Sequence, residues 1–328
     1  MAKAKRTELI KVAKLYYHGN CSQEEISRLM GYSRPHVSRM LTMARELKIV
    51  EFRISESLAE IELMTEQLKE GLGLKDVIVL PSESGRLGTM YAAGAIAGEY
   101  LNGILRPGMF IGISWGATLD VTVSQFKPRK QYDTVKVVQM IGGSQSTSFN
   151  IDSRELTVRL ADKLGASYSI LQTPQYVSSK EIRDMLLEEP EIKAHFKLLD
   201  RLDAAIVGIS STNPEHSATF RAGHISIDEA TALAEGGFVL DINGARVYKD
   251  GSVRACEMND RLMALSPEGI KRIPTVIAVA VGEDKAETIA AAAKGGFFNV
   301  LITDEVAAIS ILGRAAKIQT KGDGSCVL

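Results

Sequence analysis

The sequence is poor in cysteine and has no long apolar run. Its 328 residues include three cysteines, Cys21, Cys256 and Cys326, which lie far apart and form no CxxC pair. We therefore expect plain thiols rather than a disulfide framework or a structural zinc site. No apolar stretch approaches the roughly 18 residues that a membrane-spanning helix needs. We expect no membrane partner, no metal and no other cofactor.

Several functional signals are also missing. Residues 1–7 are basic, but charged and polar residues follow them where a secretory signal has an apolar core, so we expect a cytoplasmic protein. The phosphate-binding motif GxxxxGK[ST] is absent, and no GxGxxG opens a helix after the first expected strand. ATP hydrolysis and dinucleotide binding are therefore not expected.

Positive charge is concentrated at the N-terminus. Residues 1–54 hold eleven Lys and Arg against five Asp and Glu, whereas the remainder holds twenty-eight against thirty-five. Because counterion release favours contact of such a unit with phosphates, this pattern is typical of a nucleic-acid binder, although a solvated basic face has the same composition. The length allows one small and one large domain.

Three helices are expected in the basic unit. Apolar residues recur at helical spacing up to Tyr16, and His18-Gly19-Asn20 should end this first helix. Ser22 and Glu25 have the form of a capping box that opens a second helix, which ends at Gly31. A third helix begins at Ser33 and has a proline in its first turn.

The spacing within these helices predicts a helix-turn-helix. Ser27, Gly31 and Val37 occupy the places of the small residue, the turn glycine and the β-branched anchor. A three-helix module for protein contact is the alternative. If the apolar side of the third helix is buried, its exposed side suits the major groove and DNA phosphates and carries Arg34, His36, Ser38, Arg39, Thr42 and Arg45.

The domain boundaries follow from the next segments. Residues 49–54 alternate as in a short strand or wing, and Arg53 could touch the DNA backbone. A helix over 57–72 has an apolar stripe that either pairs subunits or packs on its own large domain. We predict a DNA-binding domain at 1–55, a linker helix at 56–75, and an effector-binding and oligomerisation domain at 76–328.

The large domain alternates strands with helices. Strands are expected at 77–80, 109–113, 135–141, 167–171, 204–209, 238–242, 275–281 and 299–302, with helices at 57–72, 88–105, 119–123 and 152–164. This alternation favours a sheet covered on both faces. The predicted fold class is α/β, with a small all-α, winged helix-turn-helix domain before a large, mainly parallel, Rossmann-like domain.

The ends of these strands are the expected ligand site. Loop N–H groups and helix N-termini at this edge favour anions, and a carboxylate such as Asp241 can accept sugar hydroxyls while Lys285 can neutralise a phosphate. We interpret Asp304 as an ordinary first-turn helix residue. Two glycine-rich loops, at 112–118 and 142–147, are the leading candidates, although such loops are often merely tight turns. Their candidate residues are Gly112, Ser114, Trp115, Gly116, Gly142, Gly143 and Ser144.

Several segments resemble one known family. SQEEISRLMGYSRPHVSRML at 22–41, IGISWGATL at 111–119, DAAIVGIS at 203–210, CEMNDRLMAL at 256–265 and the long segment at 275–305 are similar to the SorC-type sugar-binding transcriptional regulators. The resemblance covers nearly the whole chain. It implies a helix-turn-helix joined to a domain related to phosphosugar isomerases, a tetramer, and a phosphorylated sugar that changes the hold on operator DNA.

The resemblance also implies roles for single residues. Both glycine-rich loops would line the effector pocket, and Asp241 and Lys285 would contact the hydroxyls and phosphate of the effector. Glu283 replaces the second glycine of the usual Gly-Gly-x-x-Lys, which could favour a less charged ligand.

The function predicted is a DNA-binding repressor of a carbohydrate-metabolism operon that is not an enzyme. Its expected partners are double-stranded operator DNA, a sugar or sugar phosphate, and further copies of itself in a dimer or tetramer. A phosphosugar isomerase or deaminase is the alternative, with Asp241, Glu283 and Asp304 as candidate acids and bases. A domain that only oligomerises is a third reading.

Overall fold

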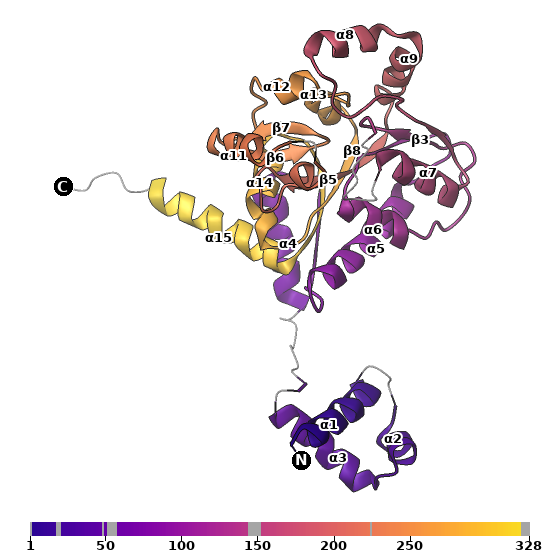
Figure 1. Cartoon of the computed structure of the whole chain (residues 1–328), viewed down its shortest axis with the longest axis vertical. Coiled ribbons are helices and arrows are strands. Elements are labelled where there is room, and N and C mark those ends of the chain that lie inside the picture. The colour runs from indigo at the N-terminus through magenta and orange to yellow at the C-terminus, as the bar shows by residue number, and fades with distance from the viewer. Residues whose placement is uncertain are drawn as a thin grey trace, which may run out of the picture. The chain divides into compact units, whose positions relative to one another are not determined.

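The chain divides into two compact units, Met1–Glu56 and Ser57–Leu328. A computed structural model describes residues 2–17, 21–47, 49–50, 58–143, 152–223 and 225–322 (Figure 1). Four predicted features lie wholly or partly outside these residues. They are the helix stop expected at 18–20, residues 51–54 of the strand expected over 49–54, with Arg53, residues 144–147 of the second glycine-rich loop, and Cys326. Within the described ranges, no helix has both the length and the apolar character needed to cross a membrane.

The N-terminal unit consists of α1 (Ala2–Tyr17), α2 (Gln23–Met30) and α3 (Arg34–Glu46). Ser22 and Glu25 form the expected reciprocal capping box at the start of α2. Gly31 ends α2 in the left-handed conformation, with a φ of 71°. Apolar side chains from all three helices form a separate small core that contains Leu9, Val12, Ile26, Val37, Met40 and Leu41. The predicted three-helix order is confirmed.

The helix-turn-helix spacing has a clear packing basis. Val37 is fully buried between the helices, as its anchoring position requires. Ser27, where alanine is the commoner choice, donates its hydroxyl to the carbonyl of Tyr32 in the turn between α2 and α3. The serine is accommodated because its hydroxyl has this acceptor.

The large unit is built on a parallel sheet. Its strand order is β1-β9-β8-β5-β2-β3-β4, and each neighbouring pair along this path is parallel. The strands are β1 (Asp76–Leu80), β2 (Phe110–Ile113), β3 (Lys136–Gln139), β4 (Ser167–Ser169), β5 (Ala204–Ser211), β8 (Thr275–Val279) and β9 (Val300–Asp304). The predicted α/β class is confirmed.

Helices cover both faces of this sheet. Ala204 and Ile206 of β5 pack on the side of α5 (Arg86–Ile104), α6 (Ala117–Gln125) and α7 (Ser153–Leu164). Ala205 and Val207, which alternate with them along β5, pack on the other side of the sheet. That side is covered by α4 (Leu58–Leu72), α9 (Pro190–Leu199), α13 (Pro267–Lys271), α14 (Ala286–Lys294) and α15 (Glu305–Gly322).

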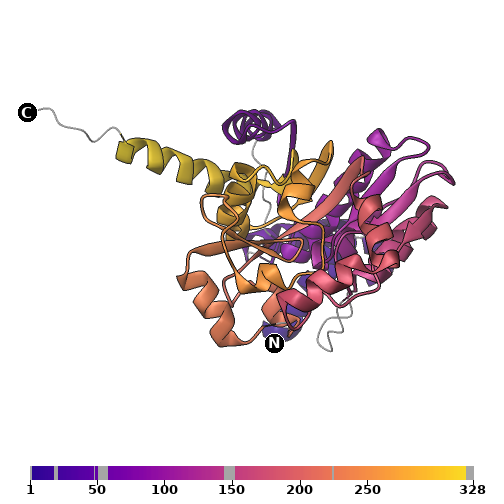
Figure 2. The same ribbon diagram turned by 90° about the horizontal axis from the view of Figure 1, so that it is seen from above.

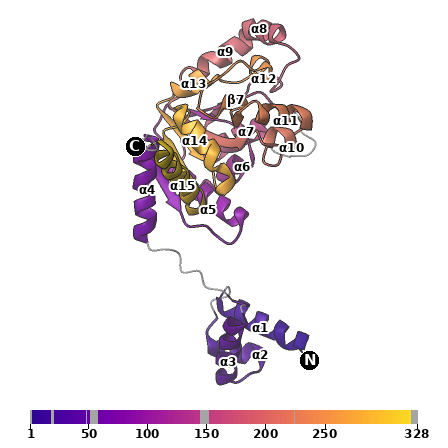
Figure 3. The same ribbon diagram turned by 90° about the vertical axis from the view of Figure 1, so that its left-hand side faces the viewer.

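Helix α4 packs on its own large unit, as one of the two sequence alternatives proposed. Ile61, Met64 and Leu68 are buried in the core beneath it. Figure 3 shows α4 beside α15, and Figure 2 shows the same helix nearly end-on next to the yellow α15. The remaining elements are α8 (Lys180–Glu188), α10 (Ala218–Arg221), α11 (Ile227–Glu235), α12 (Glu257–Asp260) and the 3₁₀ turn η1 (Glu283–Lys285).

One strand differs from the sequence expectation. β6 (Phe238–Ile242) is not part of the parallel path but pairs antiparallel with the end of β5 and with β7 (Ala245–Tyr248). Asn243 and Gly244, with φ of 49° and 84°, form the two-residue turn of this hairpin. An Asn-Gly pair is the usual signal for such a turn, because both positions need positive φ. The hairpin carries Asp241 and Asn243 to the carboxyl end of the sheet.

Candidate functional site

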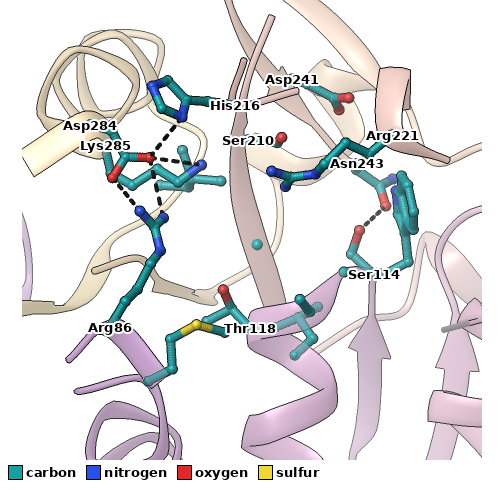
Figure 4. Close-up of a pocket in the computed structure, with 17 residues that line it drawn as sticks. Arg86, Ser114, Thr118, Ser210, His216, Arg221, Asp241, Asn243, Asp284 and Lys285 are labelled. Atoms are coloured by element: carbon teal, nitrogen blue, oxygen red, sulfur yellow. Dashed lines mark hydrogen bonds and ion pairs between the residues drawn. The ribbon is translucent and has the colours of Figure 1, made fainter. Parts of the chain in front are cut away.

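A cavity of about 280 Å³ lies at the carboxyl ends of β2, β5 and β8 (Figure 4). Ligands of open α/β sheets collect at this edge, and the sheet here provides loops from three neighbouring strands. The lining comprises residues 114–119 after β2, residues 208–210 of β5, residues 284–285 after β8, and Arg86, Met90, His216, Arg221, Asp241 and Asn243.

One side of the cavity holds a network around Asp284. Arg86, at the start of α5, donates to both carboxylate oxygens of Asp284, at 2.6 and 3.2 Å. Burial by itself would raise the pKa of Asp284, but the hydrogen bonds and charge of Arg86 outweigh it and hold that pKa below its usual value. The Nδ1 atom of His216 lies 3.9 Å from the same carboxylate. Asp284 therefore stays ionised and links α5 to the turn after β8.

Lys285 lies beside this network and is only 9% exposed. Its Nζ is 3.9 Å from Oδ2 of Asp284, too far for a hydrogen bond. Burial lowers the pKa of Lys285 to about 8, with further lowering from the charges of Arg86 and Arg221 and an opposing effect from Asp284 and Asp241. The amine therefore exchanges its proton close to physiological pH, which an ordinary surface lysine does not.

Asp241 forms a buried ion pair at the inner end of the cavity. Its carboxylate lies 2.5 Å from Nη1 of Arg246, and the two side chains are 4% and 1% exposed. The same carboxylate accepts hydrogen bonds from the hydroxyl of Thr219 and from the N–H of Gly244 at 3.1 Å. These partners fix the carboxylate where it faces the cavity.

Ser114 and Asn243 form a second fixed polar pair in the lining. The Ser114 hydroxyl donates to Oδ1 of Asn243 at 2.8 Å, and the Asn243 amide donates to the carbonyls of Met140 and Leu265. Residues 112–116 also have the GxSxG spacing of a hydrolase nucleophile, which needs a serine on a strained turn. Ser114 has no positive φ and is 1% exposed, so the local structure is not that of a nucleophile elbow.

The structure brings five of the sequence-predicted effector residues together. Trp115 and Gly116 line the cavity with Ser114, and Asp241 and Lys285 face it from the hairpin and from η1. In Figure 4 the side chains of Lys285 and Arg221 point toward each other across the cavity.

Three predicted glycines do not line this cavity. Gly112 lies inside the sheet, where a Cβ would meet Met140 Sδ at 2.6 Å. The N–H groups of Gly142 and Gly143 donate at 2.8 Å to the carbonyls of Met263 and Thr173, so they are occupied within the protein. Ser144 lies outside the described residues.

Pattern reasoning missed several charged or polar lining residues, among them Arg86, His216, Arg221, Asn243 and Asp284. For Asn243 a signal was present in the Asn-Gly hairpin turn. Asp284 directly precedes the predicted Lys285. For the other three, no local pattern marks the site, because loops distant in sequence bring them to the cavity.

Two further acidic candidates lie outside the cavity lining. Asp304 accepts the N–H of Gly282 at 2.8 Å and the hydroxyl of Ser82 at 3.2 Å, and also bonds the N–H of Ala307 in the first turn of α15. It is thus a helix-capping residue, as interpreted from the sequence. Glu283 is exposed. Among the described residues, no cluster of three or more His, Cys, Asp or Glu could hold a metal ion.

In the N-terminal unit, α3 presents all six predicted DNA-contacting residues at the surface, which are Arg34, His36, Ser38, Arg39, Thr42 and Arg45. The opposite side of the helix is buried in the small core. Arg39 Nε donates to the carbonyl of Pro35 at 3.3 Å, which keeps its guanidinium near the first turn.

Known proteins resemble this chain along nearly its whole length. Residues 56–313 match the family described as "Putative sugar-binding domain". The transcriptional regulator LsrR of Enterobacter sp. (strain 638) is 30% identical over 310 residues, which are 93% of this chain and 92% of that protein. The chain belongs to the SorC family of sugar-binding transcriptional regulators.

Two further likenesses agree with this SorC-family assignment. The sorbitol operon regulator of Klebsiella pneumoniae is 30% identical over 318 residues, which are 93% of this chain and 97% of that protein. The crystal structure of the full-length sorbitol operon regulator SorC from Klebsiella pneumoniae superimposes with a TM-score of 0.73 at 26% identity, covering 93% of this chain and 98% of that one. These relatives are transcriptional regulators and not enzymes, and so is this SorC-family chain.

Proposed function

We propose that this regulator binds operator DNA through α3 and that a phosphorylated sugar, or a related anionic metabolite, in the cavity changes its affinity for that operator. In this proposal it acts as a repressor of a carbohydrate-metabolism operon. It works in the cytoplasm, where the operator is accessible.

The charge of the cavity is the observation that carries the effector class. Arg86, Arg221 and Lys285 line it together with two carboxylates, Asp241 and Asp284. Both carboxylates already have arginine partners, Arg246 and Arg86 respectively. Lining cations thus outnumber lining anions, and this favours an effector that carries a phosphate or carboxylate.

The polar groups at the other end of the cavity suit a sugar. A carboxylate oxygen of Asp241 and the hydroxyl of Ser114 can accept hydrogen bonds from sugar hydroxyls. Trp115 offers an aromatic surface in the same lining. Pockets that combine apolar surface with a few fixed polar groups are typical small-molecule sites.

The exposed side of α3 supports the DNA part of the proposal. Arg39 can form two parallel hydrogen bonds to a guanine edge, whereas Arg34 and Arg45, nearer the helix ends, suit phosphates or flanking bases. Because operators read by helix-turn-helix proteins are usually symmetric, we propose at least a dimer, with a tetramer as the full assembly.

The test is capture of genomic DNA fragments by the purified full-length protein at a fixed salt concentration. The capture is run with and without a mixture of free and phosphorylated sugars. Selective capture that the sugars alter supports the proposal and yields the operator. If no fragment is enriched in either condition, the DNA-binding assignment is wrong.

A matched variant separates the two functions. Lys285→Ala should still enrich the same fragments, because Lys285 lies in the large unit, but should respond to the sugars only at much higher concentration. Enrichment that depends on sugars equally in both proteins would place the effector elsewhere.

A further inference from the structure

We infer that Lys285 captures its effector covalently, by forming a Schiff base with the aldehyde or ketone carbonyl of an open-chain sugar phosphate. This inference rests on the proposed effector site. It narrows the chemical class of the effector to sugar phosphates that carry a free carbonyl, and it excludes those that do not, such as sugar alcohol phosphates.

The first argument is the position of the amine. Lys285 is 9% exposed, and Figure 4 shows its Nζ pointing into the cavity. The backbone of the residue is held in place, since its N–H donates to Gly282 at 3.0 Å and its carbonyl accepts the hydroxyl of Thr288 at 2.8 Å. A ligand in the cavity therefore meets this amine at a fixed place.

The second argument is the weak pairing of the amine. Asp284, the carboxylate beside it, accepts two hydrogen bonds from Arg86, and its Oδ2 lies 3.9 Å from Nζ. A tight ion pair would keep the amine protonated and unreactive. Buried lysines next to other cations are the ones that form Schiff bases in proteins.

The surrounding charges determine how much neutral amine exists. With its pKa at about 8, roughly half of Lys285 is neutral at pH 8, about a hundredfold more than for a lysine with the ordinary value. The charges that act on it are those of Asp284 on η1, Arg86 on α5, Arg221 on α10 and Asp241 on β6. His216 lies beside the carboxylate of Asp284.

The reaction is a condensation that needs no oxidant or reductant. The lone pair of neutral Nζ attacks the carbonyl carbon; the nitrogen then loses one of its protons while the carbonyl oxygen takes one up, which gives a neutral carbinolamine. Protonation of its hydroxyl releases water and leaves a carbon–nitrogen double bond. The imidazole of His216, in the same lining, can exchange these protons with water.

The product fits the charges of the cavity. A protonated Schiff base carries the same positive charge as the original ammonium group, so its interaction with Asp284 is retained. The phosphate remains near Arg86 and Arg221. The bond is reversible by hydrolysis, so release of the effector needs only water.

The experiment uses the full-length protein and two phosphorylated aldehydes that cannot close a sugar ring, D-glyceraldehyde 3-phosphate and D-erythrose 4-phosphate. Sodium cyanoborohydride is added to trap any Schiff base as a stable amine. Intact-mass measurement counts the adducts, and peptide mapping locates them. We expect one fast adduct on Lys285, with the remaining lysines labelled at least about tenfold more slowly.

Two matched variants separate charge from covalent chemistry. Lys285→Arg keeps the positive charge but cannot form a Schiff base, so the fast adduct should disappear. Lys294→Arg, at an exposed position outside the cavity, should label as the unmodified chain does. The rate of the fast adduct should rise with pH and level off above about pH 8, because the neutral amine is the nucleophile.

Other outcomes have defined meanings. Labelling spread evenly over surface lysines, or unchanged in Lys285→Arg, overturns the covalent step.

Glycerol 3-phosphate, which has no carbonyl, distinguishes failure of the covalent step from failure of the proposed function. If it raises the melting temperature while no fast adduct forms with either aldehyde, the phosphate site stands and the Schiff base is wrong. If neither effect is seen, the proposed effector site itself is wrong.

Discussion

Asparagine at position 241 should strongly destabilise the large unit. Asp241 and Arg246 form an ion pair whose members are 4% and 1% exposed, with 2.5 Å between the charged atoms. Within the described structure, Nε and Nη2 of Arg246 have no hydrogen-bond partner. The guanidinium charge therefore depends on the Asp241 carboxylate. Asp241→Asn keeps the side-chain shape but leaves this charge buried without its counter-charge.

The expected loss follows from the burial of the pair. Removing one partner of a buried ion pair costs about 3–5 kcal/mol in the free energy of unfolding. For a domain of this size, each kcal/mol lowers the melting temperature by about 2–4 °C, so we expect a decrease of roughly 6–20 °C. A surface ion pair such as Arg129–Glu99 contributes far less, because water and salt screen its charges.

Urea unfolding followed by tryptophan fluorescence measures this loss. Trp115 is the only tryptophan of the chain and lies in the cavity of the large unit, so its emission reports on this unit. The double variant Asp241→Asn with Arg246→Met removes the unpaired charge as well and should recover most of the lost stability.

Two results would refute this reasoning. The first is an Asp241→Asn protein that unfolds within about 1 kcal/mol of the unmodified chain, since a buried unpaired guanidinium cannot be that well tolerated. The second is a double variant no more stable than Asp241→Asn, which would mean that the carboxylate acts through other contacts, such as those with Thr219 and Gly244.

Three further predictions concern other parts of the chain. Arg39→Ala should weaken specific operator binding by about 1–3 kcal/mol in a titration at fixed salt, with unchanged urea unfolding; full affinity would remove α3 as the reading helix. Lys285→Ala should lower effector affinity at least about tenfold by calorimetry while operator binding is kept; unchanged affinity would remove Lys285 from the site. Burial holds the pKa of His195 below its usual 6.5, despite its bond to the Gln139 carbonyl, so the unfolded chain gains a proton first as the pH falls. The contribution of neutral His195 to the free energy of unfolding is thus complete above about pH 6.5 and is lost as the pH falls below it. In His195→Gln the free energy of unfolding should therefore depend less on pH in that range, and an equal pH dependence in both proteins would contradict this.

Local sequence was sufficient to predict the helix-turn-helix. The Ser22 and Glu25 capping box, the left-handed glycine at Gly31 and the spacing of apolar residues on α3 act over a few residues. They specify the same helices whatever the rest of the chain does. The alternation of apolar strands and helices likewise predicted the parallel sheet, because the inner strands of a sheet covered on both faces are apolar on both sides.

The composition of the effector cavity was decided by tertiary structure. Arg86 and Asp284 are 198 residues apart in sequence and meet only because α5 begins at the edge of the sheet where η1 lies. Sequence also could not show that the N–H groups of Gly142 and Gly143 are used by neighbouring carbonyls, which removes them from the lining.

For Lys285, too, local sequence and tertiary structure decided different properties. The sequence placed a lysine after a strand, where it can neutralise a phosphate. Its burial, the engagement of Asp284 by Arg86 and the resulting shift of its pKa depend on distant segments that desolvate and surround the amine. Local pattern therefore determined the helices, the sheet and the site's edge, whereas long-range packing decided which groups line the site and how reactive they are, because desolvation and charge depend on distance in space.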